Sequence, residues 1–313
     1  MVYILLLLQH WQNTQRSNQI KFMKVTGFSF VRNAVKYGYP IQESILSILP
    51  VCDDFVIAVG KSDDETRQLI ESINEPKIKI IDTVWDDTLK KGGEVLAVET
   101  NKAFAAISAE SDWAFYIQGD EAVHEKYLDT IYKAMQQYKD DKRVDGILFK
   151  YLHFWGSYDY YAQSSRWYRN EIRIIRNDKK IYSFRDAQGF RKRDNEKLLV
   201  KPIDAYIYHY GWVREPKVMQ HKKSDFGQLW GEDDGNQKIA FDKNEFDYNG
   251  IDTLKMFNGT HPQVMQKLIE QKNWKFDYDI SKNKTKFKDR FKNFLEDVTG
   301  RRFFDYQNYK ILR

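Results

Sequence analysis

Hydrophobic positions along the first half of the chain follow two alternating patterns. Short runs of apolar, β-branched and aromatic residues predict buried strands, and apolar residues spaced three or four positions apart predict amphipathic helices. Strands are expected at 25–31, 55–59, 78–81, 113–117 and 144–154, and helices at 41–49, 66–73, 100–109 and 127–138. This alternation predicts an α/β fold with a mainly parallel central sheet flanked by helices and joined by right-handed crossovers.

The pattern changes after residue 154. An aromatic and polar stretch at 158–168 is typical of a loop that lines a site. The further elements expected are strands at 171–176, 181–184 and 205–210 and a helix at 261–271.

These patterns predict three regions. Residues 23–215 form the main domain, and residues 216–313 form a mostly helical, basic C-terminal region. The apolar run Val2–Leu8 is too short for a spanning helix, which needs about 20 residues, so residues 1–22 are interpreted as an extension outside the fold.

The site prediction depends on the segment 111–121, Ser-Asp-Trp-Ala-Phe-Tyr-Ile-Gln-Gly-Asp-Glu. Its apolar run predicts a buried strand that ends at Gly119, followed by Asp120 and Glu121. Ligands of open α/β sheets bind at the carboxyl ends of strands, and carboxylate oxygens suit a divalent cation that bridges phosphates. The alternative is an acidic turn that binds nothing.

The amino-acid composition bears on the size of the core and on the cellular compartment. Hydrophobic residues make up 42% of the 313 residues, which is enough for a large core. The single cysteine, Cys52, rules out a disulfide within the chain and indicates a reducing, cytoplasmic compartment.

The net charge of +5 is uneven. Residues 272–313 hold 12 Lys/Arg and 6 Asp/Glu, a surplus of +6, so the remainder is near −1. The basic end predicts either a peripheral contact with an anionic membrane or a solvated helical face. A nucleic-acid partner is not expected, because no recognition motif accompanies this surplus.

Two common nucleotide-binding classes are disfavoured. No G-x-G-x-x-G follows the first strand, and no G-x-x-x-x-G-K-[ST] occurs.

Five segments, in this order, resemble those of a known family. They are 29–33 (SFVRN), 59–66 (VGKSDDET), 100–103 (TNKA), 113–121 (WAFYIQGDE) and 167–176 (WYRNEIRIIR). The set, within residues 24–212, resembles the family 2 glycosyltransferases of GT-A fold, and in particular sugar transferases of the lipopolysaccharide-core type. The resemblance implies an inverting transfer, in polysaccharide biosynthesis, from a nucleotide-diphospho-sugar to a glycan or lipid-linked acceptor, with Mn²⁺ or Mg²⁺ as cofactor.

Two departures from the family pattern affect these expectations. Val59 stands where the family has the Asp that contacts the nucleotide, so the identity of the nucleotide is open. Gln118 stands where the D-x-D motif has its first Asp, which removes one charge near the cation.

The resemblance assigns the metal to Asp120 and to His209, which ends the strand at 205–210. The alternative for His209 is a packed core histidine. Glu121 is expected either behind the metal ligands or as the cap of the next helix.

The resemblance places further side chains at the donor. Asn33 contacts the nucleotide or only occupies a left-handed turn, Asp82 reads the base or caps a turn, and Lys102, at a helix start, approaches the diphosphate or is solvated. Gln118 contacts a ribose, and one of Arg173 and Arg176 clamps phosphate while the other is a surface charge. The expected donor-binding residues are Ser29, Asn33, Ser62, Asp82, Lys102, Gln118 and Arg173.

An inverting transfer needs a general base to take the proton of the acceptor hydroxyl. Asp186, after a short strand, is the leading candidate, with Glu171 and Asp204 as rivals. The related transferases often carry His-Glu here, whereas this chain has Asp186-Ala187.

Two functions therefore compete. The first is a glycosyltransferase, and the second is a non-catalytic module that binds nucleotide sugars or glycans on the same scaffold. A nucleotidyltransferase is less favoured, because no glycine-rich basic loop follows the first strand.

Overall fold

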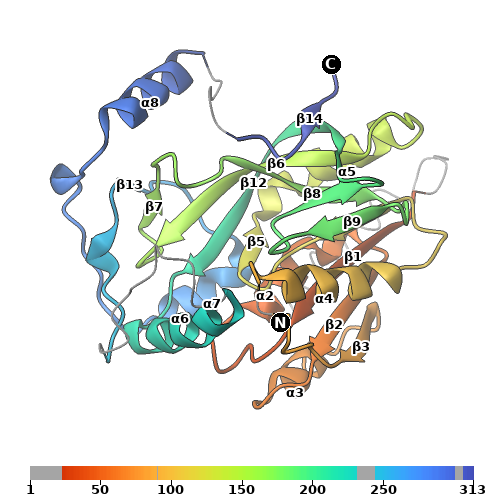
Figure 1. The fold of residues 1–313 in the computed structure, drawn as a ribbon, viewed down its shortest axis with the longest axis horizontal. Coiled ribbons are helices and arrows are strands. Elements are labelled where there is room, and N and C mark those ends of the chain that lie inside the picture. The colour runs from red at the N-terminus through yellow and green to blue at the C-terminus, as the bar shows by residue number, and fades with distance from the viewer. Residues whose placement is uncertain (1–22, 90, 231–243, 300–305) are drawn as a thin grey trace.

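The computed structural model describes residues 23–89, 91–230, 244–299 and 306–313 (Figure 1). The expected extension at residues 1–22 lies outside the described residues.

The central sheet begins with four parallel strands in the order β3-β2-β1-β4. Strand β8 is antiparallel to both β4 and β6, and β12 then runs parallel to β6. The bounds are β1 Val25–Val31, β2 Asp54–Gly60, β3 Ile78–Thr83, β4 Trp113–Tyr116, β6 Gly146–Trp155, β8 Asn170–Arg176 and β12 Leu199–Trp212.

Helices cover both faces of this sheet because its strands are apolar on both sides. Along β2, Phe55 and Ile57 point into the core beneath α2 and α5, whereas Val56 and Ala58 point into the core beneath α4. The helices are α2 Ile41–Ile48, α3 Thr66–Glu71, α4 Glu94–Ala105 and α5 Leu128–Tyr138. This arrangement confirms the expected α/β fold class, with a central sheet flanked by helices on both faces.

Several predicted boundaries were wrong. Helix α4 begins directly after Gly93, which adopts a left-handed φ of 73°, so Lys102 lies in its last turn and not at its start. The stretch at 158–168 contains a short strand, β7 Tyr160–Ala162. Glu121, expected in a turn with Asp120, instead begins β5, Glu121–Val123, which pairs antiparallel with β12.

A second, three-stranded antiparallel sheet packs beside α4. Its strands are β9 Ile181–Phe184, β10 Gly189–Lys192 and β11 Glu196–Lys197. The turn between β9 and β10 carries Asp186.

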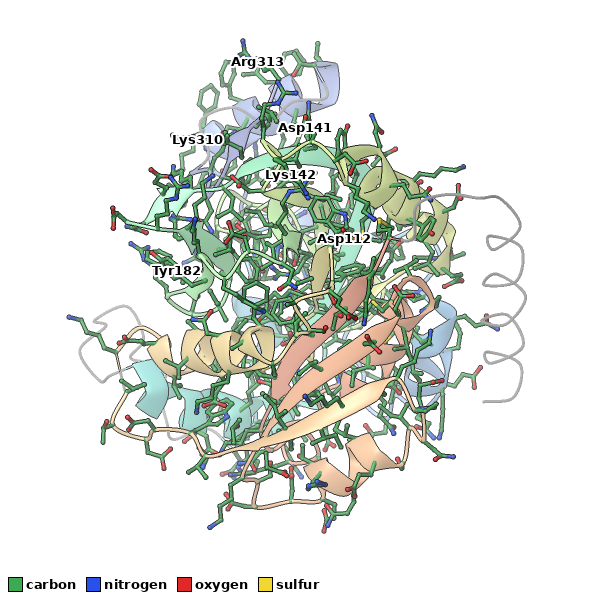
Figure 2. The ribbon with its side chains drawn as sticks, turned by 90° about the vertical axis from the view of Figure 1, so that its right-hand side faces the viewer. Asp112, Asp141, Lys142, Tyr182, Lys310 and Arg313 are labelled. Carbon is green, nitrogen blue, oxygen red and sulfur yellow. The ribbon has the colours of Figure 1, made fainter. Side chains whose placement is uncertain are left out.

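After residue 215, the described residues form helices and two short strands. Strand β13 pairs with β7, and β14 pairs with the start of β12, so Lys310 and Arg313 lie at the upper end of the molecule in Figure 2. The elements are α6 Pro216–Trp230, β13 Leu254–Met256, α7 Gln266–Glu270, α8 Phe287–Thr299 and β14 Lys310–Ile311. The helix expected at 261–271 is shorter in the structure, where a 3₁₀ turn, Gln263–Met265, leads into α7. The domain boundary at residue 215 stays a prediction.

Among the described helices, none is both long and apolar enough to cross a bilayer.

Candidate functional site

The carboxyl end of β4 brings Asp120 and His209 together. The carbonyl oxygen of Asp120 accepts a hydrogen bond of 2.7 Å from the backbone N–H of Tyr210, and Glu121 pairs with His209 across β5 and β12. The carboxylate Oδ1 of Asp120 then lies 3.8 Å from Nε2 of His209. The two residues that the family resemblance assigned to a metal are therefore neighbours, although they are 89 positions apart (209 − 120).

A chain of hydrogen bonds fixes which nitrogen of His209 carries its proton. His153 Nε2 lies 2.8 Å from the carbonyl oxygen of Tyr168, which can only accept, so this nitrogen donates. Burial lowers the pKa of both His153 and His209, so both rings are neutral. Nδ1 of His153 is then an acceptor, and Nδ1 of His209, 3.1 Å away, donates to it.

The lone pair of His209 Nε2 therefore faces the carboxylate of Asp120. Two electron-rich atoms 3.8 Å apart repel unless a cation lies between them. Bond lengths of about 2.0–2.2 Å to one divalent ion are compatible with this separation. Oδ1 of Asp120 and Nε2 of His209 therefore form a donor pair that fits a divalent cation, and His153 fixes the tautomer of His209 that this requires.

The protein supplies only part of a coordination shell. Among the residues that the structure describes, no group of three or more His, Cys, Asp or Glu could hold a metal ion. A cation at Asp120 and His209 would take its other ligands from a bound substrate and from water.

Two basic side chains approach the other oxygen of Asp120. Nζ of Lys222 lies 3.5 Å from Oδ2, and Nη2 of Arg214 lies 3.9 Å from it. Burial alone would raise the pKa of Asp120, but the neighbouring cations, first Lys222 and then Arg214, help to hold it at about 2. Burial and the charge of Arg214 lower the pKa of Lys222 to about 7.

Arg214 is buried and held rigidly, yet one of its donors is unused. Its Nε donates to the carbonyl of Tyr37 at 2.6 Å, and its Nη1 donates to the carbonyls of Tyr210 (3.2 Å) and Gly211. Nη2 is buried without a hydrogen-bond partner. Because an unpaired buried donor is costly, Nη2 is a ready contact for an anionic oxygen.

Small size at Gly211 keeps the site open. A Cβ at this position would lie 2.5 Å from the ring of His209 and 3.0 Å from Oδ2 of Asp120. Any larger residue would push against both ligand candidates.

Glu121 and Arg173 form an internal ion pair beneath the site. Both side chains are fully buried, and the guanidinium donates to both carboxylate oxygens at 2.9 and 2.8 Å. Tyr151 donates to the same carboxylate at 2.8 Å, as does the backbone N–H of Gln118 at 3.1 Å. Arg173 thus has no exposed surface for a phosphate, and Glu121 caps no helix.

Arg176, the other arginine of β8 considered for a phosphate, also has a structural role. The guanidinium of Arg176 donates to four backbone carbonyls, those of Tyr138, Lys139, Asp141 and Val144, and lies over the ring of Trp113. Neither arginine of β8 is a phosphate clamp.

The turn that carries Asp186 touches Gln118. The side-chain amide of Gln118 donates to the carbonyl of Ala187 at 3.2 Å, and Arg173 donates to that of Gln188 at 2.9 Å. Arg185 and Ala187 have φ values of 56° and 61°, a conformation that is uncommon for residues with a Cβ and is often found at functional sites. Burial raises the pKa of Asp186.

The two rival bases have different surroundings. Glu171 is fully buried, and burial raises its pKa to about 7. Asp204 is largely exposed and pairs with Lys150 at 2.7 Å.

The residues expected at the nucleotide mostly bind one another or their neighbours. Asn33 has a left-handed φ of 55°, donates its N–H to Ser62 Oγ at 3.0 Å and accepts from the N–H of Asp63 at 2.9 Å. These bonds join the loops after β1 and β2. Ser29 is fully buried in β1, and its hydroxyl lies 3.5 Å from the carbonyl of Phe30.

The last two expected donor contacts form ion pairs. Asp82 pairs with Arg67 at 3.0 Å at the surface, and Lys102 pairs with the buried carboxylate of Glu99 at 2.6 Å.

Sequence reasoning missed Arg214, Lys222, Tyr39 and His153. Arg214 and Lys222 both lie over the ring of Tyr39, at 4.7 and 4.6 Å. Arg214 stands five residues after His209, which is the one local signal that could have suggested it.

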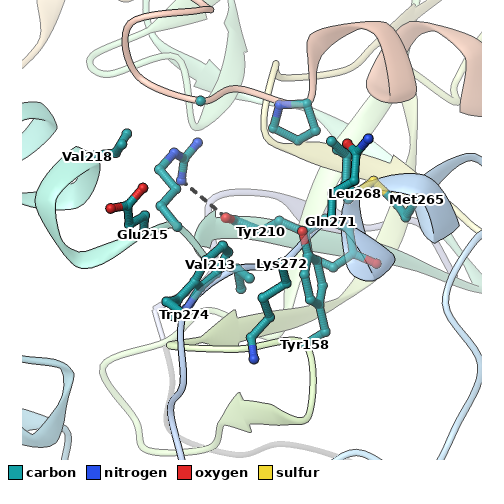
Figure 3. A pocket seen from close by; sticks show the side chains of 13 residues that line it. Tyr158, Tyr210, Val213, Glu215, Val218, Met265, Leu268, Gln271, Lys272 and Trp274 are labelled. Carbon is teal, nitrogen blue, oxygen red and sulfur yellow. Dashed lines mark hydrogen bonds between the residues drawn. The ribbon is translucent and has the colours of Figure 1, made fainter.

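A cavity of about 180 Å³ opens beside Arg214 (Figure 3). Aromatic and apolar side chains from four parts of the chain line it, among them Pro40, Tyr158, Tyr210 and Met265.

No family model matches the chain, and no curated protein sequence is similar to it. Among solved structures, it is similar to TarS of S. aureus at 16% identity and a TM-score of 0.38, over 66% of this chain and 39% of that chain. It is similar to a 4-diphosphocytidyl-2C-methyl-D-erythritol synthase from Anaerococcus prevotii at 10% identity and 0.37, over 61% and 90%. A third is glucosyl-3-phosphoglycerate synthase from Mycobacterium tuberculosis in complex with Mn²⁺, UDP and phosphoglyceric acid, at 13% identity and 0.30, over 47% of each chain.

The chain thus spans less than half of the TarS chain that it matches. Its activity, substrates and partners are therefore inferred from the geometry of its own site.

Proposed function

We propose that this protein is a glycosyltransferase that uses a nucleotide-diphospho-sugar as donor and binds the diphosphate at Asp120. One observation carries the proposal. The carboxylate of Asp120 faces the lone pair of His209 on one side and two cationic groups, Arg214 and Lys222, on the other, at the carboxyl end of β4.

A diphosphate matches these charges. Arg214 has one unused buried donor, and Lys222 adds a second cation at the same oxygen of Asp120. Both would contact phosphate oxygens and stabilise the negative charge that builds on the departing nucleotide. Asp120 and His209 would hold a divalent cation, which as a Lewis acid supplies further stabilisation of the leaving group.

Asp186 is our candidate for the general base of an inverting transfer. Its turn touches Gln118, two positions before Asp120, and burial raises the pKa of its carboxyl. A raised pKa favours proton transfer near neutral pH, because the group is then a stronger base.

The aromatic cavity beside Arg214 is our candidate for the acceptor subsite. Trp274, which is partly exposed, offers a flat apolar surface of the kind on which sugar rings stack, and the buried Tyr158 and Tyr210 line the cavity. Arg214 joins the cavity to the diphosphate site. A glycan or lipid-linked sugar is the acceptor class that this lining suits.

The nucleoside is proposed to lie at the carboxyl ends of β1 to β3. Trp85 covers Gly60 at the end of β2, so closely that a Cβ on Gly60 would overlap its ring. The indole Nε1 of Trp85 is buried without a hydrogen-bond partner, so it can donate to a base or ribose oxygen.

The proposal is tested by turnover. The purified full chain would be incubated with a panel of nucleotide sugars of different bases and Mn²⁺, and release of nucleoside diphosphate measured, with Asp120→Asn as the inactive control. Release of nucleoside diphosphate by the native chain but not by Asp120→Asn supports the transferase. Binding of a nucleotide sugar without release, with and without oligosaccharide acceptors, would support the non-catalytic binding module instead.

A further inference from the structure

Helix α8, Phe287–Thr299, exposes a stripe of apolar side chains. Phe287 is 85% exposed, Phe291 52%, Phe294 62% and Val298 67%. With about 100° of rotation per residue, these four positions fall within an arc of about 60°. Contiguous exposed apolar surface of this kind marks a site of interaction.

The opposite face of α8 is held against the rest of the protein by acidic groups. Asp289 is buried and accepts a hydrogen bond of 3.2 Å from the backbone N–H of Ser165. The carboxylate of Glu296 lies 3.9 Å from Nε of Arg169. The helix therefore turns its acidic side inward and its phenylalanines outward, the reverse of a helix that packs on its own core.

The segment before α8 fixes this orientation. Asn283 exchanges two hydrogen bonds with the backbone of Leu254 in β13, at 2.9 and 2.8 Å, and Thr285 contacts Thr253 at 3.0 Å. The helix lies at the periphery of the molecule, well apart from the central sheet (Figure 1).

Basic side chains border the stripe. Lys284, Lys286, Lys288 and Arg290 are all exposed. On the helix, Lys288 and Arg290 lie on either side of the stripe, roughly 60–100° from it. Because Asp289 and Glu296 face the protein, the charge around the stripe comes, among the described side chains, from these cations.

We propose that α8 binds an anionic membrane surface, lying in its plane. The phenylalanine stripe would enter the boundary between headgroups and acyl chains, and the flanking cations would contact lipid phosphates. At 13 residues, α8 is suited to lie on a bilayer and is too short to cross it. A second copy of the chain is a poorer occupant, because it would bring the same basic border and repel it.

The test is cosedimentation of the full chain with lipid vesicles. The protein should bind vesicles that contain phosphatidylglycerol, should bind phosphatidylcholine vesicles much less, and should be released by high salt. The double variant Phe291→Gln/Phe294→Gln should bind at least about tenfold more weakly, because each phenylalanine contributes buried apolar area. Met256→Gln, at an exposed residue of β13, is the matched control and should bind normally.

Three results would overturn the proposal. The first is no binding to phosphatidylglycerol vesicles, and the second is equal binding by the double variant and the Met256 control. The third is a dimer in analytical ultracentrifugation without lipid, lost in the double variant, while the native chain does not bind vesicles. Unchanged thermal unfolding of the double variant would show that lost binding is not lost folding.

Discussion

The Nδ1 atoms of His153 and His209 lie 3.1 Å apart, and this contact sets the direction in which His209 offers its lone pair. His153 in turn is fixed by the carbonyl of Tyr168. The two histidines are 56 positions apart in the sequence, and the parallel pairing of β6 and β12 places them side by side.

We expect His153→Phe to weaken Mn²⁺ binding by about 10–100-fold, because His209 loses the acceptor that fixes its tautomer. Isothermal titration of Mn²⁺ in the presence of a nucleoside diphosphate measures this. His124→Gln, at a histidine bonded to Thr260, is the control and should bind Mn²⁺ normally. If His153→Phe also binds normally, His153 is only a packing residue.

Removing one member of the Glu121–Arg173 pair should greatly lower the stability of the protein. Glu121→Ala leaves a buried guanidinium without its counterion, and we expect a loss of about 3–5 kcal/mol in the free energy of unfolding. Urea denaturation of Glu121→Ala, Arg173→Met and the double variant tests this.

The double variant should lose less than the sum of the single losses, since it buries no unpaired charge. Strict additivity would show that the two groups are not coupled.

Glu171 makes the stability of the protein depend on pH. Its pKa is raised to about 7 by burial, so the folded state binds a proton that the unfolded state releases at lower pH. Stability is therefore full below the unfolded pKa and falls as the pH rises through the folded pKa. Glu171→Gln, which carries no charge to bury, should gain stability relative to the native chain by roughly 2 kcal/mol between about pH 5.5 and about pH 8.

Denaturant unfolding of both proteins at the two pH values checks this gain. A constant difference between them at both pH values would mean that Glu171 titrates normally.

Asp186→Asn should lower kcat by about 10²–10⁴-fold and leave nucleotide affinity nearly unchanged, as expected for loss of a general base. Steady-state kinetics with the donor found in the turnover screen gives both quantities. Asp204→Asn, at the exposed rival, should keep its kcat. The opposite pattern would move the role of base to Asp204.

Much of the fold follows from local pattern. The runs 25–31 and 113–116 form β1 and β4 because they are rich in β-branched and aromatic residues and are buried on both faces. The same kind of local pattern failed for β5, since Glu121 is charged and its burial depends on Arg173, 52 positions later, and on Tyr151.

The site was predictable only in part. Asp120 could be chosen because it follows an apolar strand and His209 because the family resemblance points to it, and the structure brings them together. Lys222 could not, because it lies on a charged helix where nothing local separates it from its neighbours. Arg173 was misjudged for a related reason, since sequence shows the charge of a residue and not the partner that neutralises it.

The central claim is that Asp120 and His209 hold a divalent cation beside a bound diphosphate. The most direct test is titration of Mn²⁺ into the full chain, followed by electron paramagnetic resonance, with and without uridine diphosphate. Because the part of the chain that the structure describes supplies two donors, the native chain should bind Mn²⁺ tightly only with the nucleotide present. Asp120→Asn should bind it at least about 100-fold more weakly. Equal Mn²⁺ binding by the native chain and Asp120→Asn would contradict the claim.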